Sequence, residues 1–116
     1  PAEWQGIRLR AREELADAFA ILEERLQTRD WLFDEWAIID VYMLYLWWRA
    51  VGSGMDPSPF PPCTDHGRRC EARPTVAKVL DRDTAEFARL EAEGWVPDDW
   101  EPHYAGRIPP QLVAHV

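Results

Sequence analysis

The sequence has few of the features of a secreted or membrane-spanning protein. It contains only two cysteines, Cys63 and Cys70, and it opens without a signal-peptide pattern. Disulfides stabilise mainly secreted proteins, so we expect a reduced, cytoplasmic location. The longest apolar run, residues 36–48, is far short of the roughly 20 residues that cross a bilayer. This run is better interpreted as a buried helix.

Positive charge is also scarce. Thirteen Lys and Arg face 21 Asp and Glu, which gives a formal net charge of −8. Contact with a phosphate backbone requires a concentrated basic surface, and anionic membranes attract basic segments. We therefore expect no nucleic acid and no membrane as partners. The local cluster of Arg8, Arg10 and Arg12 is followed by Glu13 and Glu14, as on a solvated helix face.

Motifs for catalysis and metal binding are missing as well. The sequence has no Gly-rich phosphate loop, no Ser/His/Asp set in a recognisable context and no recognisable paired-carboxylate site. The spacing of Cys63, His66 and Cys70 resembles part of a zinc site, but a closed site needs four tetrahedral ligands. Three further residues could complete it: Asp65, His103 and His115. Because no second paired motif exists, we expect free thiols and no metal.

What the sequence does contain is one domain, residues 1–116, built from helices. Apolar residues make up 47% of the chain, which is enough for one core, and none of them alternate as in a strand. Helical spacing predicts helices over 7–27, 37–49 and 64–72, and from Pro74 to near Gly94, the last as one helix or two with a break near Asp83. Residues 52–62 are rich in Pro and Gly and form a loop. Residues 95–116 form an extended tail, with three possible anchors: Trp95, Trp100 and Tyr104. The predicted fold class is all-α.

The most informative residue is Asp40, because it interrupts the apolar run. An ionised carboxylate is rarely buried without partners. The simplest explanation is that Asp40 lies in the first turn of the helix and accepts hydrogen bonds from free backbone N–H groups there. Trp36, just outside the helix, would pack back onto it as a hydrophobic staple.

These segments, in this order, resemble the C-terminal helical domain of cytosolic glutathione S-transferases over about residues 9–90. Residues 22–26 read Leu-Glu-x-x-Leu at the end of a long helix, and a short aromatic connector follows. The buried helix then opens around Asp40, with Tyr42 two residues on. After the Pro-rich loop, residues 69–76 read Arg-x-x-Ala-Arg-Pro-x-Val. The resemblance implies a helical bundle of that type with a buried central helix.

The chain departs from the family pattern in several ways. Ala37 stands where the family's capping box has Ser or Thr, so the Asp40 carboxylate must cap the helix alone; a lost cap hydroxyl costs about 1 kcal/mol. Phe33 replaces a connector glycine. The thioredoxin-like domain that carries the glutathione site is missing, and so is the helix that usually opens the C-terminal domain. We therefore expect the chain to be a fragment of a longer protein.

By resemblance, the chain is the half of a transferase that binds the hydrophobic co-substrate, a small apolar electrophile, and is inactive alone. No catalytic residue and no cofactor are carried over; glutathione is the co-substrate of the longer parent, which would form homodimers. Asp40, Ala37 and Trp36 carry over as capping and staple residues. Trp48, and more weakly Tyr45 and Trp47, are the candidate substrate contacts, and core packing is the alternative for each.

Two other functions stay open. Domains of this type also serve as non-catalytic protein–protein docking modules, and related enzymes are glutathione-dependent isomerases, reductases or ether-cleaving enzymes. Because the upstream domain would cover apolar surface, we also expect the isolated chain to self-associate.

Overall fold

The computed structural model describes residues 2–95 as four helices: α1 (Ala2–Leu26), α2 (Ile38–Gly52), α3 (Pro61–Ala72) and α4 (Pro74–Ala92). This part of the chain has no strand, so the all-α prediction is confirmed for it. The predictions made for Trp100, His103, Tyr104 and His115 lie outside the described residues. No described helix is long and apolar enough to cross a membrane.

The helix boundaries differ from the predicted ones at a pair of prolines before α3 and at the ends of α1 and α2. α3 begins at Pro61, three residues before the predicted start, with Pro61 and Pro62 in its first turn. Proline fits there because the first helical residues need no N–H partner within the helix. α1 begins at Ala2 rather than residue 7, and α2 continues to Gly52. α4 runs without a break through Asp83.

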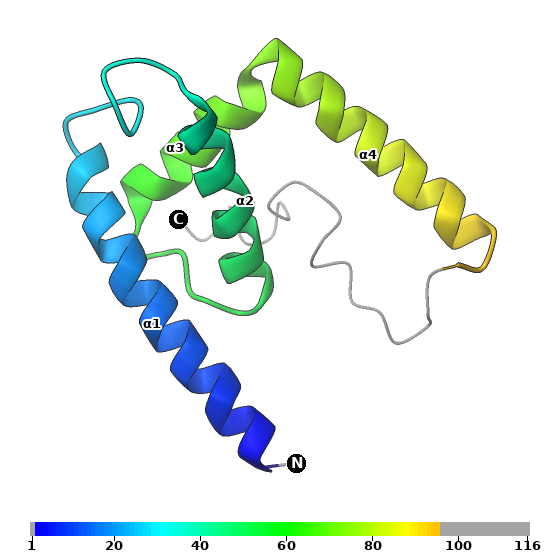
Figure 1. Ribbon diagram of the computed structural model, residues 1–116, viewed down its shortest axis with the longest axis horizontal. Coiled ribbons are helices and arrows are strands. Elements are labelled where there is room, and N and C mark those ends of the chain that lie inside the picture. The colour runs from blue at the N-terminus through cyan, green and yellow to red at the C-terminus, as the bar shows by residue number, and fades with distance from the viewer. Residues whose placement is uncertain (1, 96–116) are drawn as a thin grey trace.

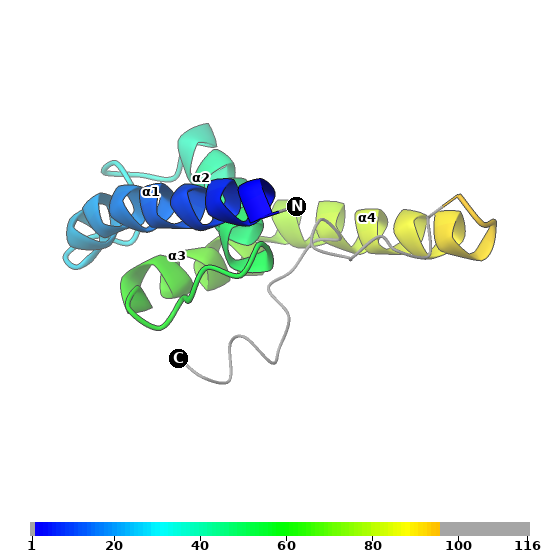
Figure 2. The ribbon, with the colours of Figure 1, turned by 90° about the horizontal axis from the view of Figure 1, so that it is seen from below.

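α3 connects the other helices, since it packs against α1, α2 and α4. Figure 1 shows α1 and α2 crossing in front of α3, and α4 turning away from the end of α3 and extending to one side. In Figure 2, α1 and α2 lie on one side of α3. The turn between α3 and α4 occurs at Arg73, whose extended backbone (ψ 130°) is what a following proline requires.

α1 also fixes the start of α3. The carboxylate of Glu23 accepts the backbone N–H of Cys63 at 2.9 Å. Pro61 and Pro62 have no N–H, so Cys63 carries the first free donor of this helix, and Glu23 satisfies it.

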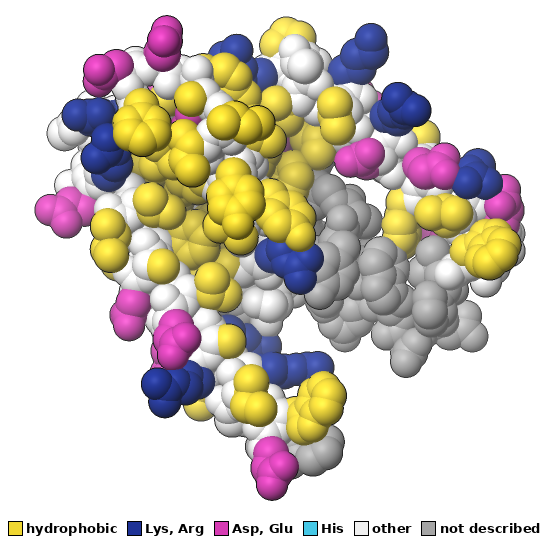
Figure 3. Space-filling model, viewed as in Figure 1, with side chains coloured by type: hydrophobic (Ala, Val, Ile, Leu, Met, Phe, Trp, Pro, Cys, Tyr) yellow, Lys and Arg dark blue, Asp and Glu magenta, His cyan; other side chains and the backbone are white. Residues whose placement is uncertain are grey.

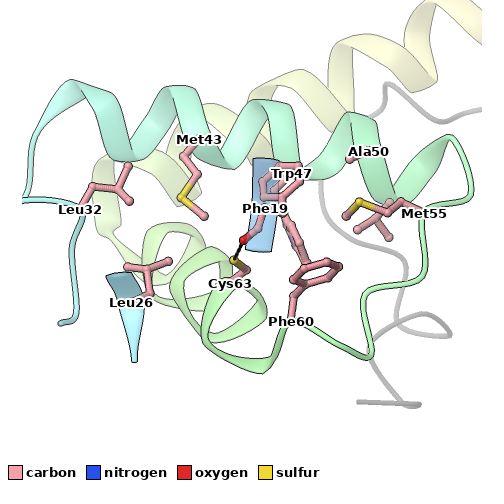
Figure 4. Packing of buried hydrophobic residues seen from close by; sticks show 10 residues of the cluster. Phe19, Leu26, Leu32, Met43, Trp47, Ala50, Met55, Phe60 and Cys63 are labelled. Carbon is pink, nitrogen blue, oxygen red and sulfur yellow. Dashed lines mark hydrogen bonds between the residues drawn. The ribbon is translucent and has the colours of Figure 1, made fainter. Parts of the chain in front are cut away.

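The core lies where α1, α2 and α3 meet. Phe19 and Trp47 pack edge to face with ring centroids 5.1 Å apart, and Phe60 lies 6.2 Å from Trp47. Aromatic pairs prefer this geometry, which adds to the apolar area that they bury. Figure 4 shows the cluster extending on both sides of these rings, through Leu26, Leu32, Met43 and Cys63 at one end and Ala50 and Met55 at the other.

α2 is buried on one side only, so the predicted buried central helix is found for that side and not for the other. Met43 and Trp47 face the core, whereas Ile38 is 81% and Tyr42 58% exposed. Hydrophobic side chains gather over α2 on the face seen in Figure 3. The described helices pack against only one side of α2, and a helix that is apolar all round then leaves apolar side chains uncovered.

Candidate functional site

Asp40 holds together three parts of the chain. Its side chain is fully buried and lies in the first turn of α2. One carboxylate oxygen accepts the N–H of Ala37 at 3.0 Å, and the other accepts the N–H of Leu32 at 3.0 Å. In a full capping box, a side-chain oxygen of residue 37 would accept the N–H of Asp40. Ala37 has no such oxygen, and the N–H of Asp40 donates to the backbone carbonyl of Ala37 instead. The carboxylate therefore joins the helix start to the connector that precedes it.

The third partner of Asp40 is His66 of α3, whose Nε2 lies 2.8 Å from the same carboxylate oxygen that binds Leu32. The two side chains are almost completely buried. Burial lowers the pKa of His66, and the hydrogen bond to Asp40 opposes this effect without overcoming it. The imidazole is therefore neutral near pH 7 and donates a hydrogen bond to the carboxylate.

Cys70 completes a Cys, His and Asp cluster, but the geometry does not suit a nucleophile. Its sulfur lies 3.7 Å from Nε2 and 3.8 Å from Nδ1 of His66, so it points at neither nitrogen in particular. The thiol is fully buried, and burial raises its pKa to about 12. Nucleophilic cysteines are accessible and have a lowered pKa. The cluster of Asp40, His66 and Cys70 is therefore structural.

The two cysteines are free, and they lie too far apart to share a metal ion. Seven residues of one helix separate Cys63 from Cys70, which corresponds to about 10 Å along the axis. The Cys63 sulfur contacts the carbonyl oxygen of Phe19. Within residues 2–95, no group of three or more His, Cys, Asp or Glu could hold a metal ion.

A groove of about 450 Å³ lies between α2 and the first half of α4, and we call it the α2–α4 groove. Its lining is mainly apolar: Val41, Leu44, Tyr45 and Trp48 from α2, Val76, Val79 and Leu80 from α4, and Trp36 before α2. Three residues add polar atoms: Arg73, Thr75 and Asp83. A concave apolar site with few polar groups is typical of small-molecule binding. A hollow of similar volume near residues 26–30 is lined mainly by polar atoms.

The helical period of α2 separates the three aromatic candidates. Trp47 and Trp48 project about 100° apart. Trp47 is 1% exposed in the core, and its indole N–H has no partner among the described residues. Trp48 lines the α2–α4 groove and donates its indole N–H to Glu71 at 2.8 Å. Tyr45 also lines the groove and is 48% exposed.

Trp36 lies at the end of the groove where α2 begins. It packs edge to face on Trp31 at 5.0 Å, and the Arg73 guanidinium stacks over its ring at 4.2 Å. Trp36 and Val41, the two positions of a hydrophobic staple, line the same groove. This arrangement places a cation on the aromatic end of an apolar site.

Sequence reasoning missed two parts of the site. The spacing of Cys63, His66 and Cys70 suggests only a metal ligand at His66, although a buried acid needs donors and a histidine is a common one. The α4 side of the groove and Arg73 were also missed. The one sequence signal at Arg73 is its place before Pro74. This position predicts a junction between two helices, but it does not indicate which other helix lies beside the junction.

Comparison with protein-family models, curated proteins and solved structures finds no match for this chain. The function therefore rests on the residues and their geometry.

Proposed function

We propose that this chain is the hydrophobic co-substrate-binding half of a glutathione S-transferase, inactive alone without a thioredoxin-like domain. The observation that carries the proposal is the α2–α4 groove, an apolar site with aromatic walls from Tyr45 and Trp48. Its volume of about 450 Å³ is in the range of small-molecule pockets. The family resemblance of the sequence supports it further.

In this proposal, Asp40 is a positioning residue rather than a catalytic one. Through Ala37, Leu32 and His66 it fixes the start of α2. The groove side chains follow on the same helix, so their placement depends on that start. Glutathione would bind to a thioredoxin-like domain of the longer protein, and this chain should not be retained on glutathione-agarose.

Binding of a neutral aromatic probe tests the groove. We expect 2-naphthalenemethanol to bind the full chain in isothermal titration calorimetry. Tyr45→Ala should weaken this binding about fivefold to tenfold, because it removes one aromatic wall. Tyr42→Ala is the matched control, since Tyr42 is a similarly exposed tyrosine of α2 outside the groove lining. Equal effects of the two variants, or no binding at all, would contradict the proposal.

A specific observation favours a second candidate, a non-catalytic docking module of the same fold. Ile38, Tyr42 and Tyr45 lie on one side of α2, spaced at helical intervals, and all are exposed. An uncovered apolar stripe of this kind is typical of protein interfaces. If a longer protein containing this chain conjugates no apolar electrophile with glutathione, and the probe does not bind, the docking function becomes the better one.

A further inference from the structure

The polar residues of the α2–α4 groove are unequally placed. Arg73 is half-buried and lies at the junction of α3 and α4, whereas Asp83 is exposed and ten residues further along, about 15 Å if the helix is straight. The groove therefore has a cation at one end and an apolar middle.

The Arg73 guanidinium is held in place by two aromatic rings. It stacks over Trp36 at 4.2 Å and faces Trp31 at 5.7 Å. Among the described residues it forms no ion pair and no side-chain hydrogen bond, whereas neighbouring Arg69 donates to the carbonyl oxygen of Asp30. Stacking restricts a guanidinium while leaving its edge N–H groups available to a planar acid.

One helix dipole and two carboxylates also bear on the charge at this end of the groove. Arg73 immediately precedes the first turn of α4, where the positive end of the helix dipole also favours an anion. Glu71, the acidic residue closest to Arg73 in the sequence, accepts the indole N–H of Trp48. The carboxylate of Asp40 is occupied by its own three donors.

We propose that the α2–α4 groove selects aromatic carboxylic acids, whose ring lies between Tyr45 and Trp48 while the carboxylate pairs with the Arg73 guanidinium. This inference rests on the proposed function, because it assigns a chemical class to the ligand of that same groove. A charged hydrogen bond at a partly buried site gives about a tenfold preference for the acid over a neutral analogue.

The test compares two ligands with the same ring system, 2-naphthoate and 2-naphthalenemethanol, by calorimetry on the full chain at about pH 7. We expect the acid to bind about tenfold more tightly than the alcohol. Arg73→Gln should bring the two affinities within about twofold of each other, because only the acid loses its charged partner. Arg69→Gln is the matched control: it removes a nearby arginine that also faces Trp31 but lies outside the groove, and should leave the preference intact.

The outcomes separate this inference from the proposed function. If the alcohol binds and the acid has no advantage, or Arg73→Gln keeps the advantage, the acid selectivity is wrong and the groove function stands. If neither ligand binds, both proposals fail. Should Arg73→Gln not fold, salt dependence on the unmodified chain provides the test. Raising NaCl to about 0.5 M should weaken binding of the acid and leave binding of the alcohol unchanged. A preference for the acid that does not depend on salt would overturn the inference.

Discussion

Replacing Asp40 by alanine should destabilise the fold strongly without any effect on a reacting group. The change removes the acceptor of three donors, the N–H groups of Leu32 and Ala37 and the imidazole of His66. Each buried donor left without a partner costs about 1–3 kcal/mol, so three of them would cost about 3–9 kcal/mol. Water can enter the space of the lost carboxylate and reach the half-buried Ala37. We therefore expect a loss of about 3–5 kcal/mol, toward the lower end of the summed costs.

This loss is large against the total stability of a native protein, about 5–15 kcal/mol. With a urea dependence of about 1.5 kcal/mol per molar, the unfolding midpoint should fall by about 2–3 M. Circular dichroism at 222 nm as a function of urea measures it. Asp34→Ala is the control: it removes the same charge from a fully exposed side chain (101%) and should change stability by less than about 0.5 kcal/mol.

A double-mutant cycle measures how much of this free energy comes from the contact between Asp40 and His66. His66→Ala should also destabilise, but Asp40→Ala and His66→Ala together should cost less than the sum of the single changes, because the second change removes a group that has already lost its partner. An unchanged midpoint for Asp40→Ala, or strictly additive costs, would refute the argument that the carboxylate is shared between α2, α3 and the connector.

The remaining predictions address other parts of the fold. Because the pKa of His66 is lowered in the folded protein, the imidazole of the unfolded chain takes up a proton at a higher pH. The free energy of unfolding should therefore keep its full value above about pH 6.5 and decrease as the pH falls below it. In urea titrations, His66→Gln should make this decrease smaller. Cys63 and Cys70 are fully buried and their pKa values are raised, so native thiols should react slowly with a disulfide reagent at about pH 8 and fast in guanidinium; equal rates would contradict their burial. Gly54→Ala should cost about 1–2 kcal/mol in thermal unfolding, since φ is +97° there. Ile38→Lys should reduce self-association in sedimentation if the exposed side of α2 drives it.

The helices themselves follow from local sequence. Apolar residues recur along α1 and α4 at the helical period, and Pro74 and Gly94 mark the limits of the last helix. For Asp40 the sequence predicts donors in the first turn of the helix, whereas the structure supplies the N–H groups of Leu32 and Ala37, which precede that turn, and the imidazole of His66. The start of α3 was not predicted, since Pro61 and Pro62 fit both a loop and a first helical turn.

The sequence by itself thus determined the helical class and a buried acid at the start of one helix, because these depend on residues within a few turns of each other. Only the tertiary structure decided that His66, 26 residues away, is the third donor to Asp40. It also decided which side of α2 stays exposed, and that Trp48 and Arg73 line one groove while Trp47 enters the core. Those choices depend on how α3 packs against α1, α2 and α4, and contacts between distant segments leave no periodic signal in a single sequence.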